Sequence, residues 1–177
     1  MFNNKFLVVD VETSGLDETI HSVLSIGACL LDTELNIINQ QYWLVKPKNP
    51  YYYTEEALKI NGFKKNEDFS RHEPISAVVQ KFHSQFAQGS VIPIFAGWNP
   101  HFDARFTQDL YRITGLQWPF SYRYFDIQTL ACFSSRGDKV TLHSELKKYN
   151  KKVSHNALQD CIDEAFLLNI YREELLN

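Results

Sequence analysis

Acidic side chains and one histidine form three short clusters that lie far apart in the chain. The first cluster is Asp10 with Glu12, and the second is Asp103. The third is His155 with Asp160. Four carboxylates can hold two divalent cations and a histidine can act as a general base, and two-metal phosphodiester hydrolysis requires these groups. The sequence therefore predicts a metal-dependent nuclease, if folding brings the three clusters together.

The first cluster lies in a predicted β-strand over residues 5–12. Side chains alternate along a strand, so Asp10 and Glu12 point to the same face. Phe6 and Val8 make the upstream part of that face apolar. Two like charges on a buried face are costly unless something compensates them, and a divalent cation would do so. The alternative is an edge strand whose polar face contacts water.

The second cluster lies at the start of a predicted helix. Asn99 and Pro100 have the residue types of an N-cap and a first helical position, so Asp103 falls in the first turn. The helix follows an apolar strand over residues 91–96, and the ends of such strands open into the crevice where α/β proteins bind ligands. The alternative is that this acid only complements the helix dipole.

The third cluster surrounds the start of the last predicted helix. Asn156 and Gln159 have the spacing of a capping box, which places His155 just outside the helix and Asp160 on it. A histidine titrates near neutrality, so one that can approach a site anchored by a helical carboxylate is a suitable general base. Taken alone, a histidine before a helix usually has no such function.

Hydrophobic periodicity predicts a mixed sheet covered by helices. Three strands form an antiparallel meander, and two further strands alternate with helices. The predicted strands cover residues 5–12, 22–31, 37–45, 91–96 and 122–125. The predicted helices cover residues 55–60, 74–87, 100–114, 127–133, 142–149 and 157–175, with Thr54, Asn99, Asp126 and Asn156 as N-caps. Together they predict one α/β domain with a five-stranded sheet across residues 1–177.

Composition narrows the class of protein. The chain has 177 residues, of which 44% are hydrophobic and 22% charged, as in an ordinary globular domain. Its net charge of −3 argues against a protein that coats DNA, but clustered catalytic acids are compatible with that charge.

The three cysteines, Cys29, Cys132 and Cys161, are scattered without a CxxC pair, so neither a disulfide framework nor a zinc site is expected. With no secretion signal or membrane span in the sequence, the expected location is the cytoplasm.

The three clusters carry a family resemblance. Residues 9–16 (Val-Asp-Val-Glu-Thr-Ser-Gly-Leu), 99–103 (Asn-Pro-His-Phe-Asp) and 155–160 (His-Asn-Ala-Leu-Gln-Asp) resemble the three exonuclease motifs of the DnaQ-like 3′–5′ exonucleases. The histidine of the third motif is typical of the DEDDh branch, which includes polymerase proofreading subunits, RNase T and oligoribonuclease. Trp98, before the second motif, departs from the family's usual residues, but no expected ligand is missing.

The resemblance implies an RNase H-like fold and an enzyme that hydrolyses the 3′-terminal phosphodiester of single-stranded DNA or RNA, releasing nucleoside 5′-monophosphates. It implies two divalent cations, Mg²⁺ or Mn²⁺. One would be held by Asp10, Glu12 and Asp160. Asp10 would also contact the second, with Asp103 supporting it through water, and His155 would take the proton of the attacking water.

The resemblance also suggests where the substrate lies. The residues implied in binding the terminal nucleotide are Thr13, Ser14, Gly15, Leu16 and Asn99. Candidates for base stacking are Tyr51, Tyr52, Tyr53 and Phe63, although packing roles are equally compatible with the sequence. The expected partner is the 3′ end of a single strand, and no membrane is expected. A proofreading subunit that docks on a polymerase, a homodimer and a non-catalytic nucleic-acid-binding module remain alternatives.

Overall fold

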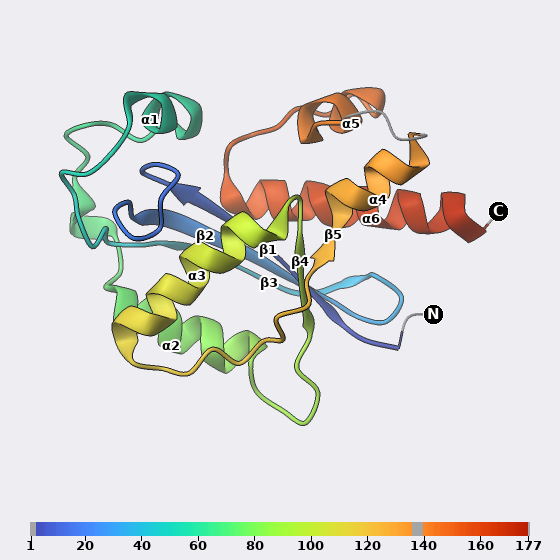
Figure 1. Cartoon of the computed structure of the whole chain (residues 1–177), viewed down its shortest axis with the longest axis horizontal. Helices are drawn as coiled ribbons and strands as arrows, with labels where there is room; N and C mark the ends of the chain where they lie inside the picture. Colours follow the sequence, from blue (N-terminus) through green and yellow to red (C-terminus); the bar gives the residue numbers. More distant parts are fainter. Residues whose placement is uncertain (1–2, 136–139, 177) are drawn as a thin grey trace.

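A five-stranded mixed sheet runs through the middle of the molecule in the order β3-β2-β1-β4-β5 (Figure 1). The computed structural model describes residues 3–135 and 140–176. β1, β2 and β3 are antiparallel neighbours, and β4 and β5 continue the sheet in parallel from β1. The strands are β1 Phe6–Thr13, β2 Val23–Leu31, β3 Ile37–Leu44, β4 Ile94–Gly97 and β5 Phe125–Asp126. The predicted meander followed by parallel strands is confirmed.

Helices cover both faces of the sheet. They are α1 Glu55–Asn61, the short 3₁₀ helix η1 Phe69–Arg71, α2 Ile75–Phe86, α3 Pro100–Thr114, α4 Ile127–Ser134, α5 Leu142–Lys148 and α6 Ala157–Leu176. Figure 1 shows α2 and α3 on one side of the sheet and α4, α5 and α6 on the other. None of the helices in the described part of the chain has both the length and the apolar character needed to cross a bilayer.

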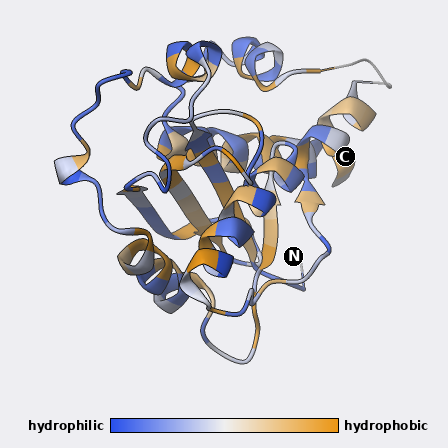
Figure 2. Ribbon diagram, turned by 60° about the vertical axis from the view of Figure 1, so that its left-hand side comes forward, coloured by the Kyte–Doolittle hydropathy of each residue, from blue (hydrophilic) through white to orange (hydrophobic). Residues whose placement is uncertain are grey.

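β1 is buried on both faces because it lies between two hydrophobic cores. Leu7 and Val9 belong to the core under α2 and α3. Phe6 and Val8 belong to the core under α6. The two cores therefore lie on opposite sides of the central strands, whose hydrophobic residues are coloured orange in Figure 2. The expectation of a buried central strand is confirmed, and the edge-strand alternative is wrong.

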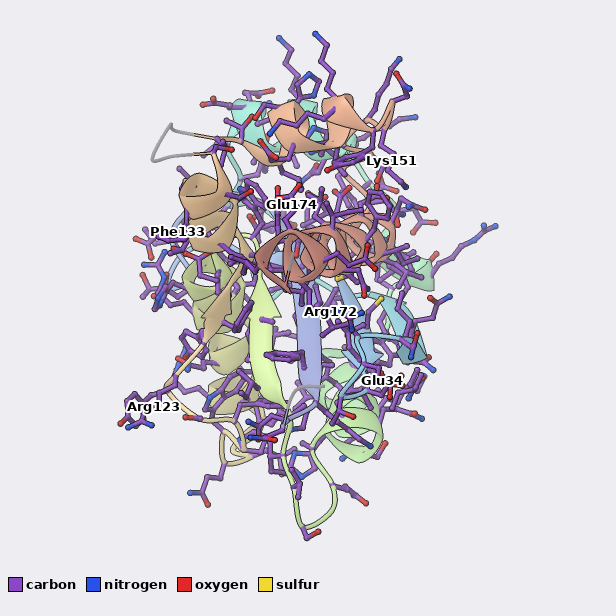
Figure 3. The ribbon with its side chains drawn as sticks, turned by 90° about the vertical axis from the view of Figure 1, so that its right-hand side faces the viewer. Glu34, Arg123, Phe133, Lys151, Arg172 and Glu174 are labelled. Atoms are coloured by element: carbon purple, nitrogen blue, oxygen red, sulfur yellow. The ribbon has the colours of Figure 1, made fainter. Side chains whose placement is uncertain are left out.

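α6 is connected to the sheet along its length. Near its end, Arg172 reaches the turn between β2 and β3, where its Nη1 donates to the carbonyl oxygen of Glu34 at 2.8 Å (Figure 3). Asn169 donates to the carbonyl oxygen of Leu35 in the same turn at 3.0 Å. These bonds fix the helix against the strands, which sets the position of the acids near its beginning.

The strands at the parallel edge are shorter than predicted. The apolar run over residues 91–96 forms a strand only from Ile94, and Val91 is 62% exposed. Pro93 has no N–H to donate to a neighbouring strand, which delays the start of pairing. β5 contains two residues in place of the predicted 122–125, because β4 offers it only Ala96 and Gly97 as partners.

Three of the four predicted N-caps are confirmed, but the side chain of Asn99 makes no capping bond, and the capping box predicted at Asn156 does not form. Thr54 and Asp126 cap α1 and α4 through their side chains as expected. Asn99 instead has a left-handed backbone, with φ of 58°, and its side chain makes no capping bond. Asn156 accepts from the N–H of Gln159 at 3.1 Å, but its own N–H donates to the hydroxyl of Ser154, so no reciprocal capping box forms.

The buried face of α3 includes Phe106 and Leu110, whereas Ile113 is 41% exposed. The buried side of the helix continues through Ala104 and Tyr111 instead. Ile113 lies near the end of the helix, where α3 has passed beyond the core that it covers.

Candidate metal-binding active site

A close approach between α6 and β2 brings the first and third clusters together. Gly27 on β2 is the register partner of Asp10 on β1. A Cβ atom at Gly27 would lie 2.3 Å from the carbonyl oxygen of Ala157 and 2.4 Å from the nitrogen of Leu158. Only a glycine leaves room for the first turn of α6 to lie on the strand. Asp160, in that turn, therefore comes beside the acids of β1.

Glu12, His155 and Asp160 meet at one point. One ligand atom from each of the three side chains lies within 4.8 Å of the others. Asp160 is 3% exposed, and its Oδ1 accepts from the N–H and the hydroxyl of Ser154 at 3.1 and 2.9 Å. His155 is exposed and has a positive φ of 52°. Within the described residues, the structure thus joins two of the predicted acids with the predicted base.

Asp103 reaches the same region from α3. Its Oδ1 accepts from the backbone N–H of Val11 at 3.0 Å, and Val11 lies between Asp10 and Glu12 on β1. The bond connects two segments that are 92 residues apart. Asp103 is therefore more than a partner of the helix dipole, although its carboxylate lies outside the group formed by Glu12, His155 and Asp160.

The acids of the site disfavour one another's charge. Burial, followed by the charges of Asp160 and Asp103, raises the pKa of Glu12 to about 8. Burial raises the pKa of Asp103 to about 7, against the opposing bond from Val11. Burial and the neighbouring acids, Asp103 first, raise the pKa of Asp10 well above its ordinary value. Such acids are favourable as anions when a cation lies among them, and oxygen ligands suit Mg²⁺ or Mn²⁺.

A fifth acid was not predicted from the sequence. Glu164 lies one helical turn after Asp160 and is 2% exposed. Its Oε2 accepts from the backbone N–H of Trp98 at 3.1 Å. Burial and the charge of Asp103 raise the pKa of the Glu164 carboxyl well above its ordinary value. The signal in the sequence is the spacing of four from Asp160, since residues that far apart share one helix face.

The segment after Glu12 is held by the last residue of α1 and by the residue that caps its beginning. The side chain of Asn61, the last residue of α1, donates to the carbonyl oxygen of Thr13 at 2.9 Å. The N–H of Thr54 donates to the carbonyl oxygen of Ser14 at 2.8 Å. Ser14 is buried, whereas Leu16 is 76% exposed. The predicted substrate-binding residues of this segment therefore lie directly beside the acids, with Leu16 open to solvent.

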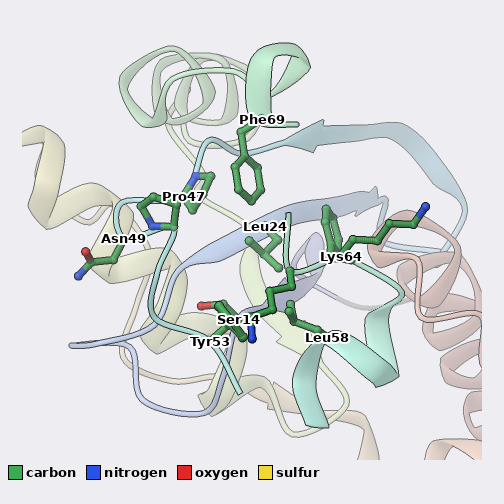
Figure 4. A pocket seen from close by; sticks show the side chains of 11 residues that line it. Ser14, Leu24, Pro47, Asn49, Tyr53, Leu58, Lys64 and Phe69 are labelled. Atoms are coloured by element: carbon green, nitrogen blue, oxygen red, sulfur yellow. The ribbon is translucent and has the colours of Figure 1, made fainter. Parts of the chain in front are cut away.

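A polar groove of about 250 Å³ adjoins the histidine. Its lining residues are Ser25, Tyr42, Asn61, Gly62, Phe63, Glu67, His155 and Asn156. A second, more apolar hollow, with a volume of only about 10 Å³, shares Phe63 and includes Ser14, Tyr53 and Phe69 (Figure 4). Phe63 is thus the predicted stacking candidate that lies next to the site.

Comparison with known proteins agrees with this geometry. The RNase T family model, described as an exonuclease, matches residues 7–167. The oligoribonuclease of Buchnera aphidicola subsp. Acyrthosiphon pisum is 27% identical over 186 residues, which cover 98% of this chain and 96% of that protein. The oligoribonuclease of Vibrio campbellii is 28% identical over 185 residues, covering 98% and 97% of the two chains.

Solved structures show the same fold. The zinc-bound complex of Escherichia coli exonuclease I with single-stranded DNA superposes with a TM-score of 0.81 at 20% identity and covers 97% of this chain. A product-bound structure of exonuclease I superposes with a TM-score of 0.74. The chain spans 41% of the length of exonuclease I in the first of these structures.

Proposed function

This chain belongs to the DnaQ-like 3′–5′ exonuclease family, and we propose that its substrates are short single-stranded oligoribonucleotides. The observation that carries the hydrolytic chemistry is the meeting of Glu12, His155 and Asp160 within 4.8 Å, beside Asp10 and Asp103. The similarity to oligoribonucleases over nearly the whole of both chains supports RNA oligonucleotides as the substrate class.

The acids would hold two divalent cations, Mg²⁺ or Mn²⁺. We assign Asp10, Glu12 and Asp160 to one cation, and Asp10 with Asp103 to the other. When bound, the cations make water a stronger nucleophile and stabilise the leaving 3′-oxygen. The buried carboxylates suit this role because their close packing is unfavourable for anions alone.

His155 would take the proton of the attacking water. His155 is exposed in a loop, so it can approach the scissile phosphate. Asp160 lies on α6, and its carboxylate accepts a hydrogen bond from the hydroxyl of Ser154. The imidazolium that forms would lie beside Glu12 and Asp160, whose negative charge stabilises it.

The 3′ end of the strand would lie along the segment of Thr13, Ser14, Gly15 and Leu16. We propose that the terminal base contacts Leu16, which is exposed and apolar, and Phe63, whose ring lines the same groove as His155. Asn99 is proposed to contact the substrate from the turn in which its left-handed backbone leads into α3.

The function is tested with end-labelled strands in Mg²⁺. A 5′-labelled short RNA should give a descending ladder, and a 3′-phosphate should slow its degradation, because the site would act on a free 3′ terminus. Short RNA should be degraded faster than long RNA and than DNA of the same sequence. Internal cuts in a circular single strand would contradict exonuclease action, and a preference for DNA would contradict the RNA assignment.

Metal binding should stabilise the fold. At about ten times its dissociation constant, Mg²⁺ should add about 1.4 kcal/mol through one site. For a domain of this size, that is a rise in melting temperature of about 3–6 °C. Asp10→Asn should be at least as stable as the parent in EDTA and should gain much less from metal, because it removes both a repulsive charge and a ligand.

The melting temperature should also depend on pH. The pKa values of Glu12 and Asp103 are raised on folding to about 8 and about 7, so protonation of these acids favours the folded state. Their contribution is complete below the ordinary pKa values of these acids and is lost progressively as the pH rises from those values to the raised ones. The parent in EDTA should therefore lose stability as the pH rises from about 4.5 to about 8, and saturating Mg²⁺ should reduce that loss. Equal melting temperatures with and without metal would show that the acids do not form a cation site.

A further inference from the structure

Two carboxylates hold the turn that connects β4 to α3. The N–H of Trp98 donates to Oε2 of Glu164 at 3.1 Å, and the N–H of Asn99 donates to Oδ1 of Asp126 at 3.2 Å. Asn99 has a φ of 58° without a capping bond from its side chain. A non-glycine residue in that conformation persists only where its surroundings impose it. The two bonds to neighbouring amides supply that constraint.

The turn determines where Asp103 lies. α3 begins directly after Asn99, and Asp103 in its first turn bonds to Val11 on β1. A Cβ atom at Gly97 would lie 3.1 Å from the carbonyl oxygen of Val9 and 3.5 Å from Oε2 of Glu164. The start of the turn, β1 and the Glu164 side chain are therefore packed against one another. A shift of the turn would displace Asp103.

Glu164 connects this turn to the helix of the third cluster. It lies four residues after Asp160 on α6, so the two side chains share a helix face. Asp160 is directed to Glu12 and His155, while Glu164 is directed to Trp98. One face of α6 thus carries the predicted metal ligand Asp160 and also contacts the turn before α3, which positions the predicted ligand Asp103.

We propose that Glu164 is a positioning residue that fixes Asp103 relative to Asp160 through its bond to the Trp98 amide. This inference rests on the proposed function, since the two aspartates are assigned there as ligands. The bond to the Trp98 amide requires an acceptor oxygen at the end of a side chain as long as that of glutamate. Negative charge is not required for that bond.

Two substitutions separate reach from charge. Glu164→Gln keeps the length and an acceptor oxygen without the charge, whereas Glu164→Asp keeps the charge on a side chain one methylene shorter. The affinity of each variant for Mn²⁺ is measured by calorimetry. The affinity of Glu164→Gln should be within about threefold of that of the parent. The affinity of Glu164→Asp should be roughly 10–100-fold weaker, which is the usual effect of losing a residue that orients metal ligands. Turnover should follow the same order, with little change in KM.

A second measurement follows the turn directly and needs neither metal nor activity. The chain has three tryptophans, so ¹⁵N-tryptophan labelling resolves the backbone amide of Trp98. Its hydrogen exchange should remain slow in Glu164→Gln and should become at least about tenfold faster in Glu164→Asp, because the amide loses its acceptor.

Glu145→Gln is the matched control. Glu145 is also a buried acid, and it accepts from the hydroxyl of Tyr171 on α6 at 2.8 Å without contacting the turn. This variant should leave both Mn²⁺ affinity and Trp98 exchange unchanged.

The results for Glu164→Gln and Glu164→Asp together show whether Glu164 has the proposed positioning role. If Glu164→Gln loses Mn²⁺ affinity, whether or not Glu164→Asp does, an acceptor oxygen at the same reach is not sufficient, the carboxylate itself is required, and the positioning role is wrong. If both variants keep the parent's affinity and Trp98 exchange, the bond has no positioning role. If the parent binds no Mn²⁺, the proposed function fails, while the exchange of Trp98 still shows whether Glu164 holds the turn.

Discussion

Asp160→Asn is expected to lower turnover by at least about a hundredfold while the protein stays folded, because losing a group that acts in the transition state costs several kcal/mol. The asparagine keeps an oxygen that can accept from the N–H and hydroxyl of Ser154, so the local structure persists. The negative charge beside Glu12 and His155 is lost. The measurement is the rate of release of mononucleotides from short RNA, together with a thermal melt.

Asp163→Asn is the matched control for this change. Asp163 lies on the same helix and is equally buried, but its Oδ1 pairs with Lys151 at 2.5 Å and it is not part of the candidate site. The control should lose some stability and keep most of its activity. Asp10→Ala should behave like Asp160→Asn. If either site variant retained more than about a tenth of the parent rate, that residue would not be a metal ligand.

His155→Ala is expected to lower turnover by roughly 10²–10⁴-fold, the usual contribution of a general base. Because His155 is exposed, the substitution should change the free energy of unfolding by no more than about 0.5 kcal/mol. Affinity for Mn²⁺ should remain nearly that of the parent. Calorimetry for the metal and steady-state kinetics on short RNA separate the two effects.

The control for this change is His143→Ala. His143 is an exposed histidine on α5 outside the candidate site, so its loss should affect neither rate nor metal binding. The proximity of His155 to Glu12 and Asp160 would also suit a ligand. A large fall in Mn²⁺ affinity in His155→Ala would therefore assign the histidine to the metal instead of the proton.

Sequence patterns were sufficient to predict those features of the structure that depend on local geometry alone. The alternation of side chains along β1 was enough to place Asp10 and Glu12 on one face. Helix periodicity predicted α3 over Pro100–Thr114. The motif order then identified His155 and Asp160 as their partners.

Contacts between distant segments could not be predicted in the same way. The bond from Val11 to Asp103 joins residues 92 positions apart, and no local pattern encodes it. Asn99 has the residue type of an N-cap, but a bond to Asp126 from another element decides its backbone. Glu164 was missed because an acid within a long helix is usually solvated, and only the packing of α6 on the sheet buries it.

The contact between Gly27 and the start of α6 has a consequence for biosynthesis. β1 and β2 are synthesised before Ala157 and Asp160, because they precede these residues in the sequence. Until α6 is made and lies against Gly27, the acids of β1 have neither the third cluster nor a general base beside them. The candidate site is therefore completed only when α6 has been synthesised and has packed on β2.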